Sequence, residues 1–256
     1  MENYIKVLDK KLWVKEIYTH LKKDKPTLIF LHEALGCIDM WKSFPEELCL
    51  KTGLNGLIYD RQGHGQSDPM TLKRGKDYLH IEALEYLPAL IKKIGIKKPI
   101  LVGHSDGGTI ALIYAAFHNV EAVITEAAHI YVEKVTTSDV SKVLEVYHSA
   151  GLKERLSKYH GDKTDDLFYA WADTWTSDWF ADWNIKELLH KIKAPVLAIQ
   201  GKEDEYASVQ HLYDIVEEIG ENAESVLIDN CQHIPHFQAK EFVLEIMNNF
   251  IQKLDY

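Results

Sequence analysis

Residues 103–107 read GHSDG and place Ser105 between two glycines, a spacing that suits a serine nucleophile. An apolar run at 100–102 comes directly before this segment, and a helical pattern of small and apolar residues begins at Thr109. A buried strand that turns within a few residues into a helix leaves the serine exposed at the carboxyl edge of the strand. Glycines suit this turn because a neighbouring side chain would collide across it. The helix behind Ser105 also directs backbone N–H groups toward any oxyanion that forms there.

A serine nucleophile needs a histidine to take its proton and an acid to orient that histidine. On a parallel sheet these groups meet where loops leave the carboxyl ends of the strands. Three acids follow the apolar run at 195–200: Glu203, Asp204 and Glu205. Two histidines follow the apolar run at 224–228: His233 and His236. Serine, then acid, then histidine is the order that accompanies such a turn, so acyl transfer is the indicated chemistry. Which acid and which histidine take part stays open at this point.

Strand-like runs alternate with helical patterns along most of the chain. The expected strands are 27–31, 56–59, 100–102, 120–125, 195–200 and 224–228. The expected helices are 39–52, 77–95 with a possible kink at Pro88, 109–117, 206–219 and 240–254. Residues 3–19 alternate polar and apolar side chains and predict an antiparallel hairpin at one edge of the sheet. This alternation indicates an α/β fold with a mostly parallel sheet covered by helices on both faces.

Residues 131–187 interrupt the alternation with charged helical stretches that are rich in aromatic side chains. The aromatic residues are Tyr147, Tyr159, Phe168, Tyr169, Trp171, Trp175, Trp179, Phe180 and Trp183. We therefore expect a core formed by 1–130 and 188–256, and a helical cap at 131–187 inserted after the sixth strand. The cap is expected to lie over the carboxyl ends of the strands, where some of its aromatic side chains line an apolar pocket and others join it to the core.

Composition excludes several classes of protein. The 256 residues are 46% hydrophobic and 27% charged, which is ordinary for a globular domain with a large core. A net charge of −10 argues against nucleic acid or an anionic membrane as partner. The sequence has no apolar signal segment and no membrane span, so we expect a cytoplasmic protein without membrane insertion. The three cysteines have no metal-like spacing and are expected to be free thiols: Cys37, Cys49 and Cys231. The sequence predicts no metal and no cofactor.

Five short motifs, spread over nearly the whole chain, together resemble the α/β-hydrolases. They are GHSDGG at 103–108, HEALG at 32–36, D-x-x-G-x-G-x-S at 60–67, G-x-x-D at 201–204 and H-x-P at 233–235. The combination of HEALG, RQGHGQSDP and GHSDGG is similar to a subgroup of small bacterial-type hydrolases. The resemblance implies the α/β-hydrolase fold and a Ser-Asp-His serine hydrolase.

Carried onto this chain, the resemblance implies Ser105 as nucleophile, Asp204 as acid and His233 as base. The other acids and histidines considered are then not expected to belong to the triad. Glu203 and Glu205 are expected to be solvated, and His236 to pack beside the site. Glu126, Asp60 and His104 are expected to be structural or pocket residues.

The resemblance also implies that the backbone N–H groups of Ala34 and Asp106 form the oxyanion hole. This chain departs from the family pattern because Glu33 stands where glycine is usual, and because Asp106 brings a carboxyl group beside the hole. An anion aimed into the hole would oppose catalysis. We therefore expect both carboxylates to point away from it or to be paired, with Arg61 and His64 as the candidate partners.

The resulting hypothesis is a cofactor-independent serine hydrolase that cleaves a small to medium carboxylic ester, thioester or lactone. Its expected partner is that small-molecule substrate. The residues proposed to line the pocket are His32, Glu33, Trp171, Trp175 and Trp179. One alternative is hydrolysis of a C–C bond in a vinylogous diketone, which would use a cationic or polar grip on a substrate carboxylate. The available cations look like a solvated helix face: Lys153, Arg155, Lys158 and Lys163. The other alternative is a non-catalytic small-molecule-binding protein on the same fold.

Overall fold

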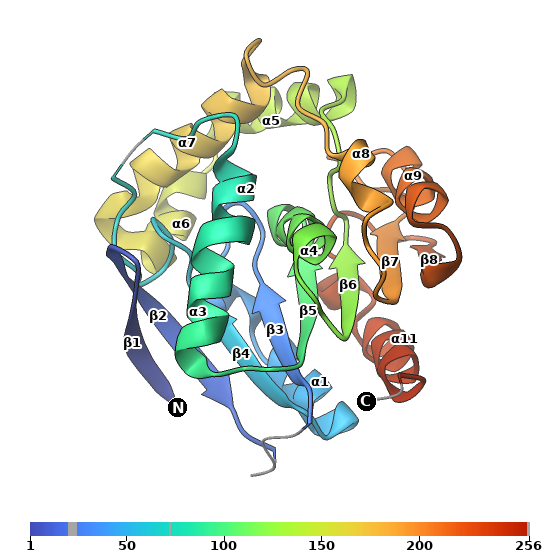
Figure 1. Cartoon of the computed structure of the whole chain (residues 1–256). Coiled ribbons are helices and arrows are strands. Elements are labelled where there is room, and N and C mark those ends of the chain that lie inside the picture. Colours follow the sequence, from blue (N-terminus) through green and yellow to red (C-terminus); the bar gives the residue numbers. More distant parts are fainter. Residues whose placement is uncertain (20–24, 72, 255–256) are drawn as a thin grey trace.

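The computed structural model describes residues 1–19, 25–71 and 73–254. Within them eight strands form one sheet in the order β1-β2-β4-β3-β5-β6-β7-β8 (Figure 1). The strands are β1 (Glu2–Val7), β2 (Lys10–Ile17), β3 (Thr27–Leu31), β4 (Asn55–Tyr59), β5 (Pro99–His104), β6 (Ala122–Glu126), β7 (Val196–Gly201) and β8 (Ala223–Ile228). β1 and β2 pair antiparallel at one edge, β2 pairs antiparallel with β4, and the remaining neighbours run parallel. The predicted mostly parallel sheet with an N-terminal hairpin at its edge is confirmed.

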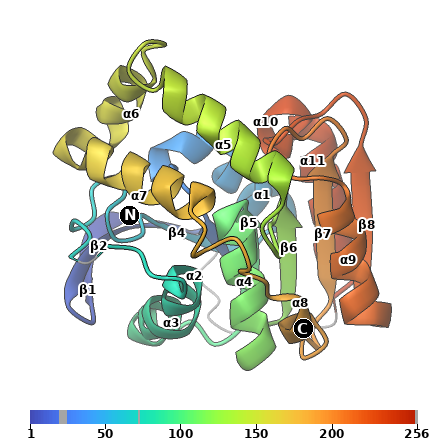
Figure 2. The ribbon, with the colours of Figure 1, turned by 90° about the horizontal axis from the view of Figure 1, so that it is seen from above.

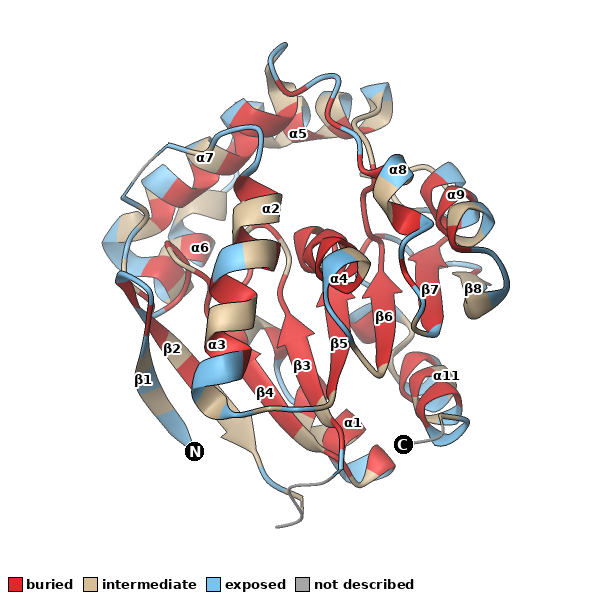
Figure 3. Ribbon diagram, viewed as in Figure 1, coloured by how far each residue is buried: buried red, intermediate tan, exposed pale blue. Residues whose placement is uncertain are grey.

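Helices cover both faces of the sheet. One face carries α2 (Tyr78–Ile81), α3 (Leu87–Ile94), α4 (Asp106–Phe117), α8 (Lys186–Leu189) and α9 (Gln210–Ile219), and the other carries α1 (Phe44–Thr52) and α11 (Lys240–Gln252) (Figure 2). Each face has its own cluster of buried apolar side chains. The inner strands are therefore buried throughout (Figure 3), which explains why their sequences read as continuous apolar runs.

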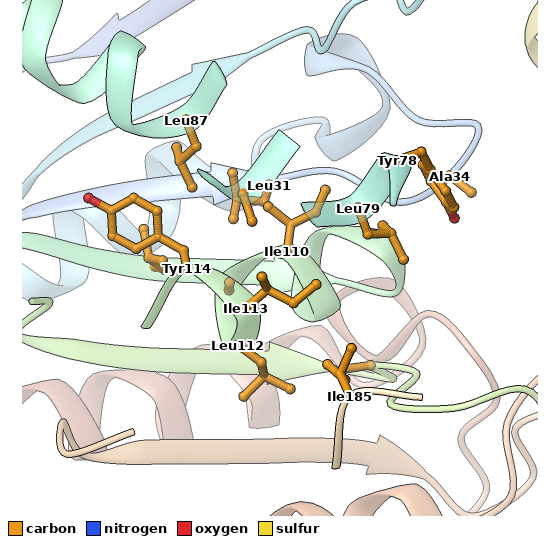
Figure 4. Packing of buried hydrophobic residues seen from close by; sticks show 14 of the residues in the cluster. Leu31, Ala34, Tyr78, Leu79, Leu87, Ile110, Leu112, Ile113, Tyr114 and Ile185 are labelled. Carbon is orange, nitrogen blue, oxygen red and sulfur yellow. The ribbon is translucent and has the colours of Figure 1, made fainter. Parts of the chain in front are cut away.

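The small and apolar residues of α4 allow this helix to pack tightly behind the nucleophile turn. Ile110, Leu112 and Ile113 are fully buried in the cluster that also holds Leu31 of β3, Leu79 of α2 and Ile185, toward which Leu112 points (Figure 4). A helix that is apolar on nearly every side must be enclosed by protein. The first turn of α4 is consequently held in a fixed position at the end of β5.

The sequence allowed a kink at Pro88, but the structure has a π-helical turn just before this proline instead. A π-helical turn, Glu82–Tyr86, separates α2 from α3, and Pro88 lies in the first turn of α3. Proline lacks an N–H and its ring crowds the carbonyl four residues earlier, so a wider turn just before it relieves the clash. The helical backbone thus continues from Tyr78 to Ile94.

Three helices lie beyond the carboxyl ends of the parallel strands, in the region toward which the arrowheads point in Figure 1. They are α5 (Lys134–Val146), α6 (Leu152–His160) and α7 (Thr164–Thr176), and all fall inside the predicted cap. His160 accepts a hydrogen bond from the Gly65 N–H at Nδ1 and donates one from Nε2 to the carbonyl of Leu35. The Lys163 ammonium donates to two further carbonyls, of Gly65 and Ser67. α6 and the residues after it are thereby fixed to the loops that follow β3 and β4.

None of the helices in these ranges is long and apolar enough to cross a membrane. The three cysteines are buried free thiols, as expected from the sequence: Cys37, Cys49 and Cys231.

Candidate active site

Ser105 lies at the junction of β5 and α4 in a strained backbone conformation, with φ 53° and ψ −119°. Both flanking glycines are needed for the turn. A Cβ on Gly103 would lie 2.2 Å from the carbonyl oxygen of Gly107, and a Cβ on Gly107 would lie 1.9 Å from that of Leu31. The turn is held in place by the Ser105 N–H, which donates to the carbonyl of Glu126 at 2.8 Å. The predicted strand–turn–helix elbow is therefore present, with the serine at its apex.

The loops after β7 and β8 bring an acid and a histidine to this serine. His233 Nε2 lies 3.1 Å from Ser105 Oγ, and His233 Nδ1 lies 2.9 and 3.0 Å from the two carboxylate oxygens of Asp204. Asp204 is held in turn by the backbone N–H groups of Tyr206 and Ala207. The Asp204 contact keeps the histidine proton on Nδ1, which leaves the Nε2 lone pair facing the hydroxyl.

The protonation states suit a general base. Burial alone would lower the pKa of His233, but the negative charge of Asp204 and its hydrogen bond raise that pKa above the ordinary value. Burial alone would raise the pKa of Asp204, but the interaction with His233 lowers it. Asp204 is thus ionised at neutral pH, and His233 accepts a proton more readily than an isolated imidazole.

Neither neighbouring acid reaches the histidine base. Glu203 is exposed and accepts a hydrogen bond from the Cys231 N–H at 2.9 Å, and Glu205 is exposed. The G-x-x-D spacing therefore selected the acid that the structure brings to His233.

The other histidines near the elbow are held by different partners. His236 donates from its backbone N–H and from Nδ1 to the buried carboxylate of Glu126, at 2.9 and 3.0 Å. His104 Nε2 donates to the carbonyl of His233 at 2.8 Å. Glu126 and His104 therefore help to hold the loop that carries the base, as expected of structural residues.

The two amides predicted for the oxyanion hole belong to different elements. Asp106 is the first residue of α4, where the helix leaves its N–H groups without intrahelical acceptors, and Ala34 lies in the loop after β3. Both residues line the same cavity as Ser105 and His233. The carbonyl of Ala34 accepts a hydrogen bond from His64 Nε2 at 3.0 Å.

The Asp106 carboxylate is paired away from the hole. The Tyr78 hydroxyl donates to it at 3.0 Å, and the Arg61 guanidinium lies 3.9 Å from it. Arg61 also donates to the carbonyls of His32 and Glu33, at 3.2 and 2.7 Å. The expected pairing with Arg61 is thus present for Asp106.

Glu33 behaves differently from the expectation. Its carboxylate lines the cavity and accepts a hydrogen bond from the Leu35 N–H, and it pairs with neither Arg61 nor His64. His64 is instead occupied by backbone carbonyls, because the tight loop brings those closer than the carboxylate.

Asp60 is structural, as predicted. It lies buried beneath the loop after β4 and accepts hydrogen bonds from the N–H groups of Ile38 and Gln66, at 2.7 and 2.8 Å. Burial raises its pKa to about 6. A Cβ on Gly65 would lie 1.9 Å from this carboxylate, which explains the second glycine of the 60–67 motif.

A cavity of about 240 Å³ opens at Ser105 and extends beneath the cap. The cap contributes side chains at helical spacing from each of its helices: Thr136, Val140 and Val143 from α5, Leu152 and Leu156 from α6, and Trp171 and Trp175 from α7. The cavity is largely apolar, and it lies at the small end of the range for ligand sites.

Two of the five predicted pocket residues do not line this cavity. Trp179 is 47% exposed and lines a separate groove with residues of α7 and with Met70, Thr71, Lys73 and Arg74. His32 is buried at the end of β3, where its Nε2 accepts a hydrogen bond from the Arg61 N–H at 3.1 Å. Glu33, Trp171 and Trp175 do line the cavity.

The sequence interpretation missed other residues of the site. His129 and Tyr206 line the cavity, and their rings lie 5.8 and 4.9 Å from the His233 ring. Apolar residues four apart in the cap helices also line it, and this spacing was readable in the sequence. His129 and Tyr206 lie in irregular loops and carried no such periodic signal.

Comparison with known proteins gives a consistent result. A sequence model of the alpha/beta hydrolase fold matches residues 26–147. The chain is 25% identical over 245 residues to a proline iminopeptidase of Saccharolobus solfataricus, covering 79% of this chain and 77% of that protein. It is 23% identical over 255 residues to 3-oxoadipate enol-lactonase 1 of Acinetobacter baylyi, covering 91% of each. The crystal structure of an alpha/beta hydrolase enzyme from a Medee basin deep-sea metagenome library superimposes with a TM-score of 0.81 at 18% identity, covering 99% of each chain.

Proposed function

We propose that this chain, which has the α/β-hydrolase fold, is an enzyme that hydrolyses a small carboxylic ester, thioester or lactone through an acyl-enzyme on Ser105. The observation that carries the proposal is the continuous contact from Asp204 through His233 to Ser105. Ser105 and His233 line the apolar cavity, and Asp204 lies behind His233 within hydrogen-bond reach of it.

In the proposed mechanism, Ser105 Oγ attacks the carbonyl carbon while His233 Nε2 accepts the hydroxyl proton. Asp204 stabilises the resulting imidazolium. The oxyanion receives hydrogen bonds from the N–H groups of Ala34 and Asp106, which aim at the charge only as it develops. His233 then returns its proton to the leaving alcohol or thiol. A water molecule, activated by the same imidazole, attacks the acyl-enzyme and restores Ser105.

The cavity supports an ester-like substrate over a C–C bond hydrolase. A vinylogous diketone with a carboxylate would use a cationic or polar grip, and none of the four cap cations lines the cavity. Lys153 pairs with Asp165, and Lys163 is bonded to carbonyls of the loop after β4. Arg155 donates to a carbonyl of its own helical region. The cavity volume of about 240 Å³ favours a small acyl group.

The test is labelling with a fluorophosphonate probe, combined with turnover of p-nitrophenyl esters of increasing acyl length. We expect the wild type to label at Ser105 and to prefer short esters, and Ser105→Ala to abolish both. His233→Ala removes the base and lowers kcat by orders of magnitude. Labelling without turnover of any ester would favour the non-catalytic binding protein. Absence of labelling in the folded protein would refute the proposal.

A further inference from the structure

Glu33 places a carboxylate in the wall of the substrate cavity without a matching cation. It occupies the loop after β3, lines the cavity with Ser105 and His233, and is only half-buried. One carboxylate oxygen, Oε2, accepts the N–H of Leu35. No lysine or arginine in the described ranges forms an ion pair with it. Burial raises the pKa of Glu33, and the Leu35 N–H together with the charges of Arg61 and His233 oppose this. A cation that entered the cavity beside Glu33 would favour its ionised form further.

The neighbouring carboxylate of Asp106 is compensated by partners within the protein, unlike that of Glu33. Arg61 and the hydroxyl of Tyr78 neutralise it from behind, outside the cavity. Arg61 turns toward the backbone carbonyl of Glu33 and leaves the side-chain carboxylate of Glu33 without an ion pair. A carboxylate withdrawn from water costs free energy unless an opposite charge joins it.

The rest of the cavity has the chemistry that would accept such a charge. The described residues that line the cavity include no lysine and no arginine. They do include the aromatic side chains of Trp171, Trp175 and Tyr206. Aromatic faces attract cations, and a carboxylate hydrogen-bonds strongly to an ammonium group. A substrate carboxylate would find no lysine or arginine among these lining residues, and it would meet the carboxylate of Glu33.

We propose that Glu33 binds an ammonium group of the substrate, so that the enzyme acts on a small amine-bearing ester or amide and discriminates against carboxylate-bearing ones. This proposal rests on the proposed function. Under this proposal, Glu33 determines substrate specificity, and this role explains why a glutamate stands where the motif usually has glycine.

The test compares esters that differ only in charge. The first pair is the p-nitrophenyl esters of alanine and of isobutyric acid, in which an ammonium replaces a methyl group on the acyl side. The second is acetylthiocholine and its neutral 3,3-dimethylbutyl thioester, which places a permanent cation on the leaving group. The p-nitrophenyl monoester of methylmalonate supplies the anion. The measured quantity is the ratio of kcat/KM between the charged and the neutral ester, so any loss common to both cancels.

The critical variant is Glu33→Gln, which keeps an oxygen for the Leu35 N–H but removes the charge. In the wild type we expect the cationic ester of at least one pair to exceed its neutral isostere, and the anionic ester to be the poorest. In Glu33→Gln that preference falls about tenfold or more. Glu205→Gln is the matched control, because this exposed acid near His233 lies outside the cavity lining, and it retains the preference.

Three outcomes are informative. A cation preference that disappears only in Glu33→Gln supports the proposal. Equal turnover of both members of each pair, or a preference that survives in Glu33→Gln, overturns it and leaves Glu33 as a structural partner of Leu35. No turnover of any ester, together with no fluorophosphonate labelling of Ser105, refutes the proposed function itself.

Discussion

At the scale of single residues, the site is defined by close approaches that only certain side chains permit. Ser105 tolerates its positive φ because the β5–α4 turn is held by the packing of α4 and by the N–H of Ser105 itself. Such strain persists only where the surrounding structure fixes it. The serine is thus presented to His233 before any substrate arrives, which lowers the reorganisation needed for attack.

The Asp204–His233 contact predicts a specific pH profile. His233 must be neutral to act as base, and Asp204 raises the pKa of His233 above its ordinary value. The wild-type kcat/KM should therefore rise with pH through a midpoint above that of a free imidazole. Asp204→Asn removes the negative charge, so the midpoint moves to lower pH while kcat falls about a hundredfold or more. Ester hydrolysis measured across the pH range checks both effects. An unshifted midpoint would show that Asp204 does not set the basicity of His233.

Gly65 predicts a stability effect at the same scale. A Cβ at this position would lie 1.9 Å from the Asp60 carboxylate, and φ is +45°. Gly65→Ala should lower the free energy of unfolding by about 2–4 kcal/mol, from overpacking and backbone strain together. Gly95→Ala is the control, since φ there is +83° but nothing lies within 4 Å of the added Cβ. Urea denaturation should show a clearly smaller loss for Gly95→Ala. Equal losses would mean that backbone strain alone explains the glycine at 65.

At the scale of elements, the error on Trp179 has a simple cause. Trp171, Trp175 and Trp179 are spaced four apart and suggest a single face of one helix. α7 ends at Thr176, so the first two share the cavity wall and the third lies beyond the helix. Helix ends are poorly marked in this sequence because the segment has neither glycine nor proline at 177–179.

The attachment of the cap through His160 leads to a prediction about catalysis. His160 joins the Gly65 N–H to the carbonyl of Leu35, and Leu35 lines the cavity. His160→Ala leaves both backbone groups without this partner and should lower stability by about 1–3 kcal/mol. It should also lower kcat/KM for small esters severalfold, because the loop that carries Ala34 loses its support. His148→Ala, on the exposed side of the cap, should change neither quantity. Thermal unfolding and ester kinetics on both variants decide the matter, and unchanged kinetics in His160→Ala would argue against such a role.

At the scale of the whole molecule, the order of the strands explains what could be predicted from the sequence. The runs that became β3, β5, β6 and β7 were readable because parallel strands covered on both faces are largely apolar, whereas β8 is an edge strand with exposed and half-buried residues. Since the carboxyl ends of such strands meet at one edge, Ser105 could be assigned to one site with an acid from 203–205 and a histidine from 233–236. The resemblance to the α/β-hydrolases then implied Asp204 and His233, which the structure brings to Ser105. The pairing of Arg61 with Asp106 was expected from the sequence, but the hydrogen bonds from Arg61 to the carbonyls of His32 and Glu33 were not, because they join backbone groups of separate loops and leave no local pattern.

The net charge of −10 acts on the substrate over a longer range than Glu33 does, and salt separates the two effects. A negative protein attracts cations and repels anions, and added salt screens this field. In the wild type, raising the ionic strength should lower kcat/KM for the cationic ester, raise it for the anionic ester and leave the neutral ester unchanged. Glu33→Gln removes one charge from a net charge of −10, so the dependence on salt should persist in this variant, while the preference for the cation at any fixed salt concentration falls. If the salt dependence instead vanished in Glu33→Gln, the single carboxylate in the cavity would account for the whole electrostatic selection.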